Sequence, residues 1–328
     1  MERRIINLAV TVDTECDKGE KWQVRQPLSF ENTRSGLRNN LQPIFDRHCV
    51  KATYLLSPEV IEDDESVSYF KSLGNSVELG THLHSEYIEP EADFDSPSTD
   101  HYQSDFPYEI EFEKLKNLTG LFKRTFGYKP ASFRAGRFGI SHNTLSQLQE
   151  LGYLVDSSVT PDIMWKNTNG NSANFHGTPY QPYFPSSKDF RKYGDLQILE
   201  VPVSTINPKL VRLPLWVKRR INLKTRYHHI FYNILTHQAK TLWLRPTYSD
   251  VDAMKLVTEL LIRHARNDKL FLCMMFHSNE FTLGASPYSL NQEAVDLLQD
   301  RLDRFFKVMQ DSYNIKYVGL ADVAREIQ

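Results

Sequence analysis

Strand-like and helix-like segments alternate along most of the sequence, and this alternation constrains the fold more than any other feature. The segment 5–12 (IINLAVTV) is β-branched and of strand length, whereas apolar residues between 33 and 45 follow a helical period. Because a crossover helix returns the chain to the same end of a sheet, the alternation predicts parallel strands. About seven such units suit a closed α/β barrel better than an open sheet.

The predicted elements follow one another along the chain. Strands are expected at 5–12, 52–57, 76–84, 131–134, 153–156, 196–203, 269–277 and 315–318. Helices are expected at 33–45, 58–73, 115–126, 145–151, 254–261, 290–309 and 320–327. Thr33 is expected to cap the first helix, which Pro43 either kinks or delays. Ser141 and Gly152 are expected to begin and end the fourth helix.

Two stretches interrupt this rhythm. Residues 85–107 are acidic and loop-like, and residues 162–250 are rich in Asn, Pro, Tyr and Trp, which is typical of a long insertion. Neither an internal repeat nor a low-complexity linker marks a domain boundary, so we expect one barrel domain over residues 1–328.

Composition narrows the class of protein. Apolar residues make up 40% of the chain, which supports a buried core. The formal net charge of −2 gives no general attraction to nucleic acid, so no nucleic-acid partner is expected. Three cysteines without CxxC spacing argue against a disulfide framework. With no signal-peptide pattern or membrane-length apolar run in the sequence, these features predict a soluble protein of the cytoplasm.

Ionisable residues stand where the predicted strands end. Function in barrels collects at the C-terminal ends of the strands. Reading those ends in chain order gives Asp13 and Glu15, His82 and His84, Arg134 and Arg137, Asp156, and His277. A solvated surface would scatter such groups, so we expect them to share one site.

Two of these strand ends carry the ligand types of a hydrolytic metal site. Positions i and i+2 of an extended chain project to the same side, so Asp13 and Glu15 can enter one pocket together. His82 and His84 have the same spacing and can present two nitrogens to Zn²⁺. Each pair alone also fits a solvated or structural position. Together, one carboxylate and two imidazoles make a three-ligand site with open positions for water.

Five motifs resemble those of a known family. TVDTE, GTHLHSE, SFRAGRFG, DSSVTP and MMFHSNE occur in the order of the motifs of polysaccharide deacetylases, the carbohydrate esterase family 4 or NodB-homology family. The resemblance spans roughly residues 8–280 and is greatest for cytoplasmic, polysaccharide-locus members that carry DxE and HxH motifs. It implies a distorted (β/α)7-type barrel. It also implies metal-dependent N-deacetylation of an amino sugar in surface polysaccharide or lipopolysaccharide assembly, the sugar being free or linked to a nucleotide, lipid or polymer.

The resemblance also implies ligands for one divalent metal ion, which we expect to be Zn²⁺. Asp13 matches the general base and Glu15 the metal-binding acid, although Thr14 separates two acids that are adjacent in the family, so the roles could be exchanged. His82 matches the first metal-binding histidine. The second histidine of the family lies four residues further on.

In this sequence Glu86 occupies that position, four residues after His82, and His84 lies between His82 and Glu86. Two nitrogen donors suit Zn²⁺ better than one, which favours His84 as the third ligand and leaves Glu86 as the alternative.

The remaining matches concern proton transfer and substrate. Arg134 matches the arginine that orients the base, and Asp156 matches an acid expected to accept a hydrogen bond behind the site. His277 matches the general acid that protonates the leaving amine. Arg137 is expected to bind an anionic group of the substrate, and a backbone N–H near Arg137 or Phe138 is expected to hold the oxyanion.

Three weaker signals lie outside these motifs. Residues 209–226 carry seven Lys/Arg and no acid, which fits docking to a membrane surface, binding of an acidic sugar, a solvated helix face or a surface of an oligomer. Cys16, next to Glu15, is interpreted as structural, with thiolate ligation as the alternative. The insertion is rich in aromatic residues that either stack on sugar rings or form a small core of their own: Trp165, Tyr180, Tyr183, Phe184 and Tyr193.

Two other functions are compatible with the sequence. The first is a catalytically silent barrel that binds carbohydrate, because the usual second histidine is displaced. The second is a metal amidohydrolase or phosphoesterase on another barrel, although such proteins usually place HxH on the first strand, whereas here it ends the third.

Overall fold

The computed structural model describes residues 4–24, 26–93, 101–167, 170–221, 226–236, 239–265 and 269–327. Residues 94–100 of the predicted acidic loop and residues 222–225 of the predicted basic stretch lie outside the described residues.

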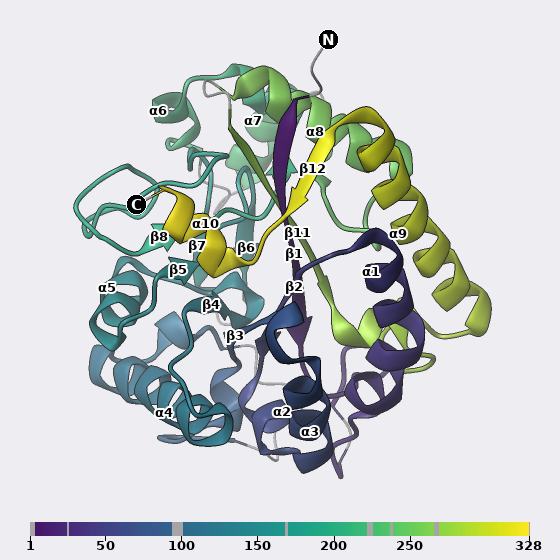
Figure 1. The fold of residues 1–328 in the computed structure, drawn as a ribbon. Helices are drawn as coiled ribbons and strands as arrows, with labels where there is room; N and C mark the ends of the chain where they lie inside the picture. The colour runs from purple at the N-terminus through teal and green to yellow at the C-terminus, as the bar shows by residue number, and fades with distance from the viewer. Residues whose placement is uncertain are drawn as a thin grey trace.

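A curled parallel sheet forms the centre of the molecule (Figure 1). Within the described part of the chain its strands are β1 (Ile5–Thr14), β2 (Ala52–Leu56), β3 (Glu78–Leu83), β4 (Ser132–Ala135), β5 (Val155–Asp156), β8 (Leu199–Glu200), β11 (Leu270–His277) and β12 (Asn314–Tyr317). The order is β11-β1-β2-β3-β4-β5-β8, and every pairing is parallel. β12 pairs with Ile5–Leu8 of β1, before the part of β1 that pairs with β2. The predicted distorted (β/α)7-type barrel is therefore confirmed.

Helices surround this sheet (Figure 1). They are α1 (Gln42–His48), α2 (Pro58–Glu62), α3 (Asp64–Leu73), α4 (Tyr108–Phe126), α5 (His142–Leu151), α8 (Val251–His264), α9 (Gln292–Ser312) and α10 (Leu320–Ile327). Ser141 caps α5 by accepting from the backbone N–H of Asn143 and Thr144, and Gly152 ends it with φ of +89°, so both predictions are confirmed.

Two predictions about the first helices are wrong in detail. Thr33 is no cap, because it lies inside the first helical segment, the π-helix Asn32–Leu41. The carboxylate of Asp17 instead accepts from the N–H groups of Glu31 and Asn32 at the start of this segment. Pro43 delays α1, which begins at Gln42. The helix expected at 58–73 breaks at Asp63, whose side chain caps α3 by accepting from the N–H of Ser66.

The strand expected at 196–203 is shorter than predicted because the chain changes partner. Val201 N–H bonds the carbonyl of Asp156, but Ser204 N–H bonds the carbonyl of Cys273 in β11. Among the described residues no strand pair joins β8 to β11. The side-chain amide of Gln181 instead pairs with both backbone groups of Phe271, at 3.0 Å each, so it takes the place of a neighbouring strand.

The stretch 162–250 contains β8 and several small elements. Two antiparallel pairs join β6 (Met164–Lys166) to β7 (Ser172–Asn174) and β9 (Thr205–Ile206) to β10 (Leu242–Trp243). α6 (Leu215–Lys218) and α7 (Arg226–Thr236) lie together at one side of the barrel (Figure 1). None of the described helices combines the length and the apolar character that a membrane span requires.

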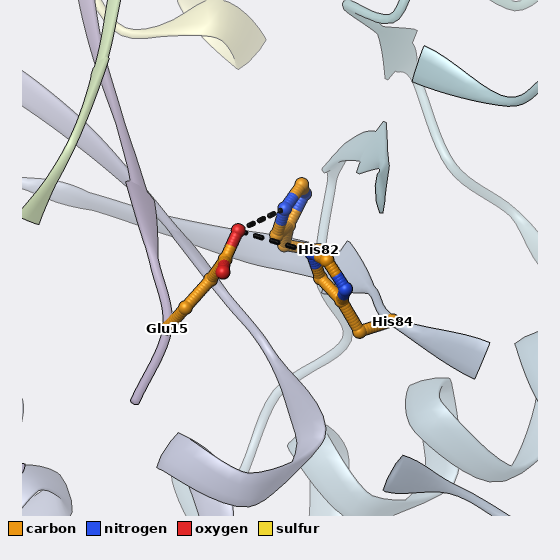
Figure 2. A group of neighbouring side chains, drawn as sticks. All are labelled: Glu15, His82 and His84. Carbon is orange, nitrogen blue, oxygen red and sulfur yellow. Dashed lines mark hydrogen bonds and ion pairs between the residues drawn. The ribbon is translucent and has the colours of Figure 1, made fainter. Parts of the chain in front are cut away.

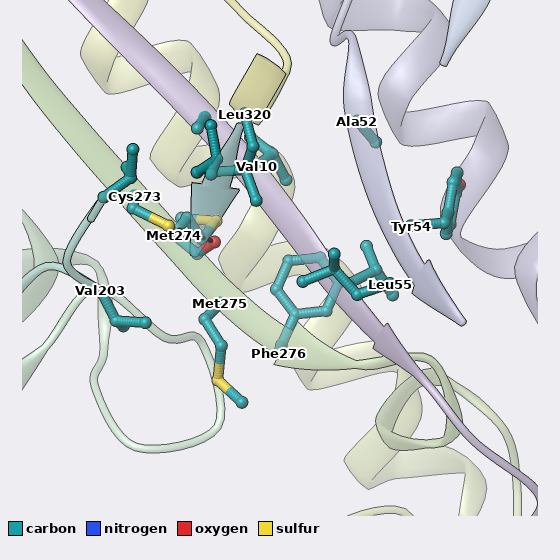
Figure 3. Close-up of a cluster of buried hydrophobic side chains, with 14 of the residues drawn as sticks. Val10, Ala52, Tyr54, Leu55, Val203, Cys273, Met274, Met275, Phe276 and Leu320 are labelled. Carbon is teal, nitrogen blue, oxygen red and sulfur yellow. Dashed lines mark hydrogen bonds between the residues drawn. The ribbon is translucent and has the colours of Figure 1, made fainter. Parts of the chain in front are cut away.

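Alternation along β1 separates the core from the site. Val10 and Val12 are fully buried, and Val10 packs in an apolar cluster with residues such as Leu55, Phe276 and Leu320 (Figure 3). Thr11, on the other side of the strand, bonds the carbonyl of Met274. The side chains that follow Thr11 at intervals of two are Asp13 and Glu15, so the strand delivers both acids to the same side.

Candidate metal centre and active site

Strand register brings the predicted residues together at the C-terminal ends of the strands. Asp13 of β1 is the register partner of His277 of β11, and His82 of β3 is the partner of Arg134 of β4. All four side chains line or underlie one pocket at this edge. Neighbouring parallel strands therefore supply the site, as the reading of strand ends predicts.

Glu15, His82 and His84 form a buried three-residue group (Figure 2). Glu15 Oε1 lies 3.2 Å from His82 Nε2 and 3.0 Å from His84 Nε2. Within the described part of the chain this is the one group of His, Cys, Asp or Glu whose ligand atoms, all within 4.8 Å of one another, could hold a metal ion. Asp13 and Glu86, the alternative ligands, are not part of it.

The hydrogen bonding of His82 shows that this group suits a cation. His82 Nδ1 lies 2.9 Å from the carbonyl oxygen of Arg134, which can only accept, so Nδ1 carries the hydrogen. The Nε2 of a neutral ring then presents a lone pair to the Glu15 carboxylate, which also only accepts. Two acceptors at this separation need a positive charge between them. A carboxylate with two imidazoles is a donor set that Zn²⁺ accepts.

His84 lies between two carboxylates. Its Nε2 faces Glu15, and its Nδ1 lies 3.2 Å from Glu86 Oε1. Burial lowers the pKa of His84, but the charges of Glu15 and Glu86 outweigh burial and raise it to about 9. Glu86 therefore sits behind the ring of His84 and on the far side from Glu15. The site attracts positive charge at the nitrogen that faces Glu15.

Two residues that the sequence did not single out hold Glu15 in place. Lys18 Nζ lies 3.1 Å from Glu15 Oε2, and both side chains are buried. Asn32 Nδ2 donates to the backbone carbonyl of Glu15 at 2.9 Å. Lys18 therefore binds one carboxylate oxygen and leaves the other directed at the histidines. Its spacing of three residues from Glu15 is the sequence signal that could have found it.

Asp13 forms a fully buried ion pair with Arg134. Arg134 Nη1 donates to Asp13 Oδ1 at 2.6 Å, and the same guanidinium donates to the carbonyl and the hydroxyl of Ser157 at 2.7 and 2.8 Å. Burial raises the pKa of Asp13, but the charges of Arg134, His82 and His277 outweigh it and leave the pKa below its usual range. Asp13 is thus an oriented, ionised carboxylate beside the group of Glu15, His82 and His84.

His277 is held by a pair that the sequence prediction missed. Its Nδ1 lies 2.8 Å from Glu280 Oε1, while its Nε2 faces the pocket, 3.6 Å from Glu15 Oε1. Glu280 also accepts from Arg245, and from Thr247 at 2.8 Å. Burial raises the pKa of Glu280, but the charges of Arg245 and His277 hold it below its usual value. Glu280 lies within the motif MMFHSNE, three residues after His277, which is a signal that could have identified it.

Asp156 lies behind the site and contacts neither Asp13 nor His277 in the interactions described. Its Oδ1 accepts from Ser158 Oγ at 2.7 Å, and Ser158 Oγ accepts from the N–H of Ala135 in β4. Burial raises the pKa of Asp156 and raises that of its hydrogen-bonded neighbour Glu200 further. The charge of Asp156 contributes to the raised pKa of Glu200, and Asp156 itself accepts a hydrogen bond from Ser158.

Arg137 borders the pocket next to the group of Glu15, His82 and His84. Its Nη2 donates to Glu86 Oε1 at 2.8 Å, and about 29% of its side chain stays exposed. Gly136 allows this turn to lie against His84, because a Cβ at Gly136 would stand 3.1 Å from Cδ2 of His84 and 2.5 Å from the carbonyl oxygen of Leu83. Arg137 thus braces Glu86 from the same position in which it could meet a substrate.

The pocket has a volume of about 320 Å³ and combines charged with aromatic walls. It is lined by Asp13, Glu15, Lys18, Trp22, His82, His84, Tyr102, Ala135, Arg137, Phe138, Trp165, Lys166, Arg245, Tyr248 and His277. Of the insertion aromatics named from the sequence, Trp165 lines it, stacked 5.3 Å from Phe138. Tyr183 is buried in the insertion, and Tyr180 bonds Asp162. Trp22, missed by the sequence analysis, packs 5.2 Å from the ring of His277.

The cysteines play no part in this group. All three are free thiols, so the predicted lack of a disulfide framework is confirmed. Cys16 is buried with Sγ 3.8 Å from Tyr87 Oη, and burial raises the pKa of its thiol to about 12. Cys16 is not part of the group of Glu15, His82 and His84, and this agrees with the structural interpretation of its side chain.

Comparisons with solved structures identify the fold. A protein from Mycobacterium smegmatis assigned as a polysaccharide deacetylase matches 100% of this chain and 91% of its own, with a TM-score of 0.54 and 13% identity. A protein from Pseudomonas aeruginosa with the same assignment matches 98% and 90%, with a TM-score of 0.51 and 14% identity. A protein from Parabacteroides distasonis assigned as a glycoside hydrolase or deacetylase matches 99% and 71%, with a TM-score of 0.60 and 12% identity.

No protein-family model and no curated protein sequence matches this chain. Identities of this size show a shared fold, and they confirm the fold that the resemblance to polysaccharide deacetylases implies. A shared fold does not determine the reaction, which depends on the residues of the site itself.

Proposed function

We propose that this protein is a metal-dependent N-deacetylase of an amino sugar, acting in the cytoplasmic assembly of a surface polysaccharide or lipopolysaccharide. The observation that carries this proposal is the juxtaposition of three groups in one pocket: a buried carboxylate–imidazole cluster, an oriented carboxylate at Asp13, and an imidazole at His277. Amide hydrolysis requires a water nucleophile, stabilisation of the carbonyl oxygen and a proton for the departing amine, and these groups match those requirements.

Glu15, His82 and His84 are the residues proposed to hold the metal. When bound, a divalent ion such as Zn²⁺ supplies Lewis acidity and lowers the pKa of water to about 7. Lys18 and the carbonyl of Arg134 fix the directions in which Glu15 and His82 offer their ligand atoms. With three protein ligands, the centre keeps positions open for water and substrate.

Asp13 is proposed to accept the proton of the attacking water. Its lowered pKa keeps it ionised at neutral pH, and Arg134 fixes the carboxylate through Oδ1. The oxygen of water then forms a bond to the acyl carbon while one proton passes to Asp13.

His277 is proposed to supply the proton for the departing nitrogen. Its Nε2 faces the pocket, and Glu280 accepts from Nδ1–H, which fixes the orientation of the ring. The C–N bond breaks as Nε2–H passes to nitrogen, so the products are a carboxylate and the free amino sugar. Trp22 covers one side of the imidazole and limits its contact with solvent.

The direct test measures the acid released from amides. The zinc-loaded protein should release acetate or formate from at least one member of a panel of N-acetylated and N-formylated amino sugars, free and nucleotide-linked. Chelation should abolish release, and Zn²⁺ should restore it. If the chain binds a sugar of the panel by calorimetry but releases no acid in any metal-loaded state, the catalytically silent carbohydrate-binding barrel replaces the deacetylase.

A Glu280→Gln variant tests the proposed acid. We expect amide hydrolysis to slow by roughly tenfold to a hundredfold, because a neutral side-chain amide stabilises the protonated imidazole less well than a carboxylate does. Hydrolysis of 4-nitrophenyl acetate should change little, because its leaving group departs without a proton. The rates of the two reactions on one enzyme preparation give the comparison.

Glu293→Gln, at an exposed acid in the first turn of α9, is the matched control and should leave both rates unchanged. Equal slowing of amide and ester hydrolysis in Glu280→Gln would contradict the role in proton donation and would indicate a structural role instead.

A further inference from the structure

The second half of the insertion is strongly basic, although the whole chain is nearly neutral. Residues 201–249 contain nine Lys/Arg and no Asp or Glu, in a chain whose formal net charge is −2. The catalytic pocket uses one of these cations, Arg245. Most of the others belong to α6, α7 and the segments next to them. Such segregation of charge creates a local positive potential on a chain that is nearly neutral overall.

α6 and α7 both pack on the turn at residues 176–177. At Gly177 an added Cβ would stand 2.6 Å from the carbonyl oxygen of Leu215 in α6, so α6 lies directly on the turn. The preceding residue, His176, packs edge-to-face on Tyr232 of α7, with ring centroids 5.6 Å apart. Figure 1 shows the two helices at the same side of the barrel.

A buried ion pair fixes the inner side of α6. Lys218 is fully buried, and its Nζ lies 3.0 Å from Asp162 Oδ1 and 2.7 Å from the hydroxyl of Tyr180. This anchor determines which side of α6 meets the barrel. Trp216, two residues earlier, is left 59% exposed on the outside.

The outer side of α7 is apolar as well. Ile230 and Ile234 are four residues apart and share one side of the helix, whereas Tyr232 lies on the opposite side, against the turn. Their exposed fractions are 49% and 67%. Three large apolar side chains therefore point away from the barrel on neighbouring helices. We call them, with the exposed cations of the adjoining segments, the basic face.

Exposed cations lie in the segments next to α6 and α7 in the chain: Lys209, Arg212, Arg220 and Lys240. The guanidinium of Arg220 lies 5.3 Å from the ring centroid of Trp216, so charge and apolar surface are presented together. The adjoining loop has two acids: Asp189 is occupied by Arg191 and Lys192 of the same loop, and Asp195 accepts from Ser187. No acid on α6 or α7 offsets the positive charge.

We propose that the basic face docks on a bilayer that contains anionic phospholipid. Tryptophan and isoleucine would enter the interfacial region while the lysines and arginines meet the headgroup phosphates. Each cation near an anionic surface strengthens binding by roughly fivefold. This proposal does not rest on the deacetylase activity, because it concerns a surface distinct from the pocket and can be measured by binding alone.

The test is co-sedimentation of the full-length protein with phosphatidylcholine vesicles, with and without phosphatidylglycerol. We expect binding to the anionic vesicles, weakening with added salt, and little binding to the neutral ones. The triple substitution of Lys209, Arg212 and Arg220 by Gln should weaken binding by roughly a hundredfold. The double substitution Trp216→Ser with Ile234→Ser should weaken it by at least about tenfold. Leu297→Ser, at a residue 53% exposed on α9, is the matched control and should bind as the unaltered protein does.

Three outcomes would overturn the proposal. The first is no binding to either kind of vesicle. The second is binding that neither set of substitutions reduces. The third combines two results: the unaltered protein binds no vesicles, and sedimentation velocity shows a dimer that the Trp216→Ser and Ile234→Ser variant has lost. This result would assign the face to a second copy of this chain. Because the substituted side chains are exposed, unchanged melting temperatures should accompany every variant.

Discussion

Replacing His82 with alanine is expected to reduce deacetylase activity by roughly a thousandfold or more and to remove stoichiometric zinc. His82 offers Nε2 to the centre while its Nδ1–H is held by the carbonyl of Arg134, so the variant loses a pre-oriented ligand. Without the metal, several kcal/mol of charge stabilisation at the carbonyl oxygen are lost, and every 1.36 kcal/mol changes the rate about tenfold. Metal content by mass spectrometry and acid release by the same preparation are the two measurements.

His264→Ala provides the matched control for this substitution. His264 is exposed in the last turn of α8, where it bonds the carbonyl of Leu260, and it is not one of the residues that line the pocket. The control should retain zinc and rate. A His82→Ala protein that keeps stoichiometric zinc and normal acid release would show that the proposed centre is wrong.

The same measurements decide between the two candidates for the third ligand. His84 shares Glu15 Oε1 with His82, whereas Glu86 bonds the opposite nitrogen of His84 and the guanidinium of Arg137. His84→Ala should therefore lose zinc, and Glu86→Gln should retain it with affinity reduced by about tenfold to a hundredfold, as expected when a partner of a ligand is removed. Loss of zinc from Glu86→Gln together with its retention in His84→Ala would make Glu86 the ligand.

The fold and the meeting of Glu15, His82 and His84 could be predicted because they follow from local patterns. β-branched runs mark strands, a parallel sheet aligns their C-terminal ends, and residues at i and i+2 share a side. These rules are enough to predict that Glu15 lies beside His82 and His84, and the structure brings the three together. Ser141 and Gly152 bound α5 for equally local reasons.

Features that depend on distant contacts could not be read in the same way. Arg245 reaches Glu280 across 35 positions, and no local pattern relates the two. Asp17 caps the helical segment at Asn32 from a loop, so the prediction of a cap at the nearby Thr33 is wrong. β8 ends early because Ser204 finds a partner in β11. Each error arises where a tertiary hydrogen bond outweighs the local preference of the sequence.

An Asp13→Asn substitution is expected to slow turnover by about 10²–10⁴-fold while zinc stays bound. The asparagine side chain can still accept the hydrogen bond of Arg134 Nη1 through its amide oxygen, so the geometry survives, but it has no basic oxygen to take a proton. Because Asp13 is not part of the Glu15, His82 and His84 group, metal content should be unchanged. Turnover at saturating substrate and zinc stoichiometry are measured on the same sample, below the lowered melting temperature expected when Arg134 loses its buried counter-charge.

Glu15→Gln completes the comparison, because the two acids lie only two residues apart and the sequence alone allowed their roles to be exchanged. Glu15 contacts Nε2 of His82, Nε2 of His84 and Lys18, whereas Asp13 contacts Arg134. Glu15→Gln should therefore lose zinc, and Asp13→Asn should retain it. Zinc lost from Asp13→Asn and retained in Glu15→Gln would reverse the assignment. Each substitution removes one charge and keeps the shape of the side chain, so the pair separates metal binding at Glu15 from proton transfer at Asp13. The two roles differ because Glu15 faces His82 and His84, whereas Asp13 is held by Arg134.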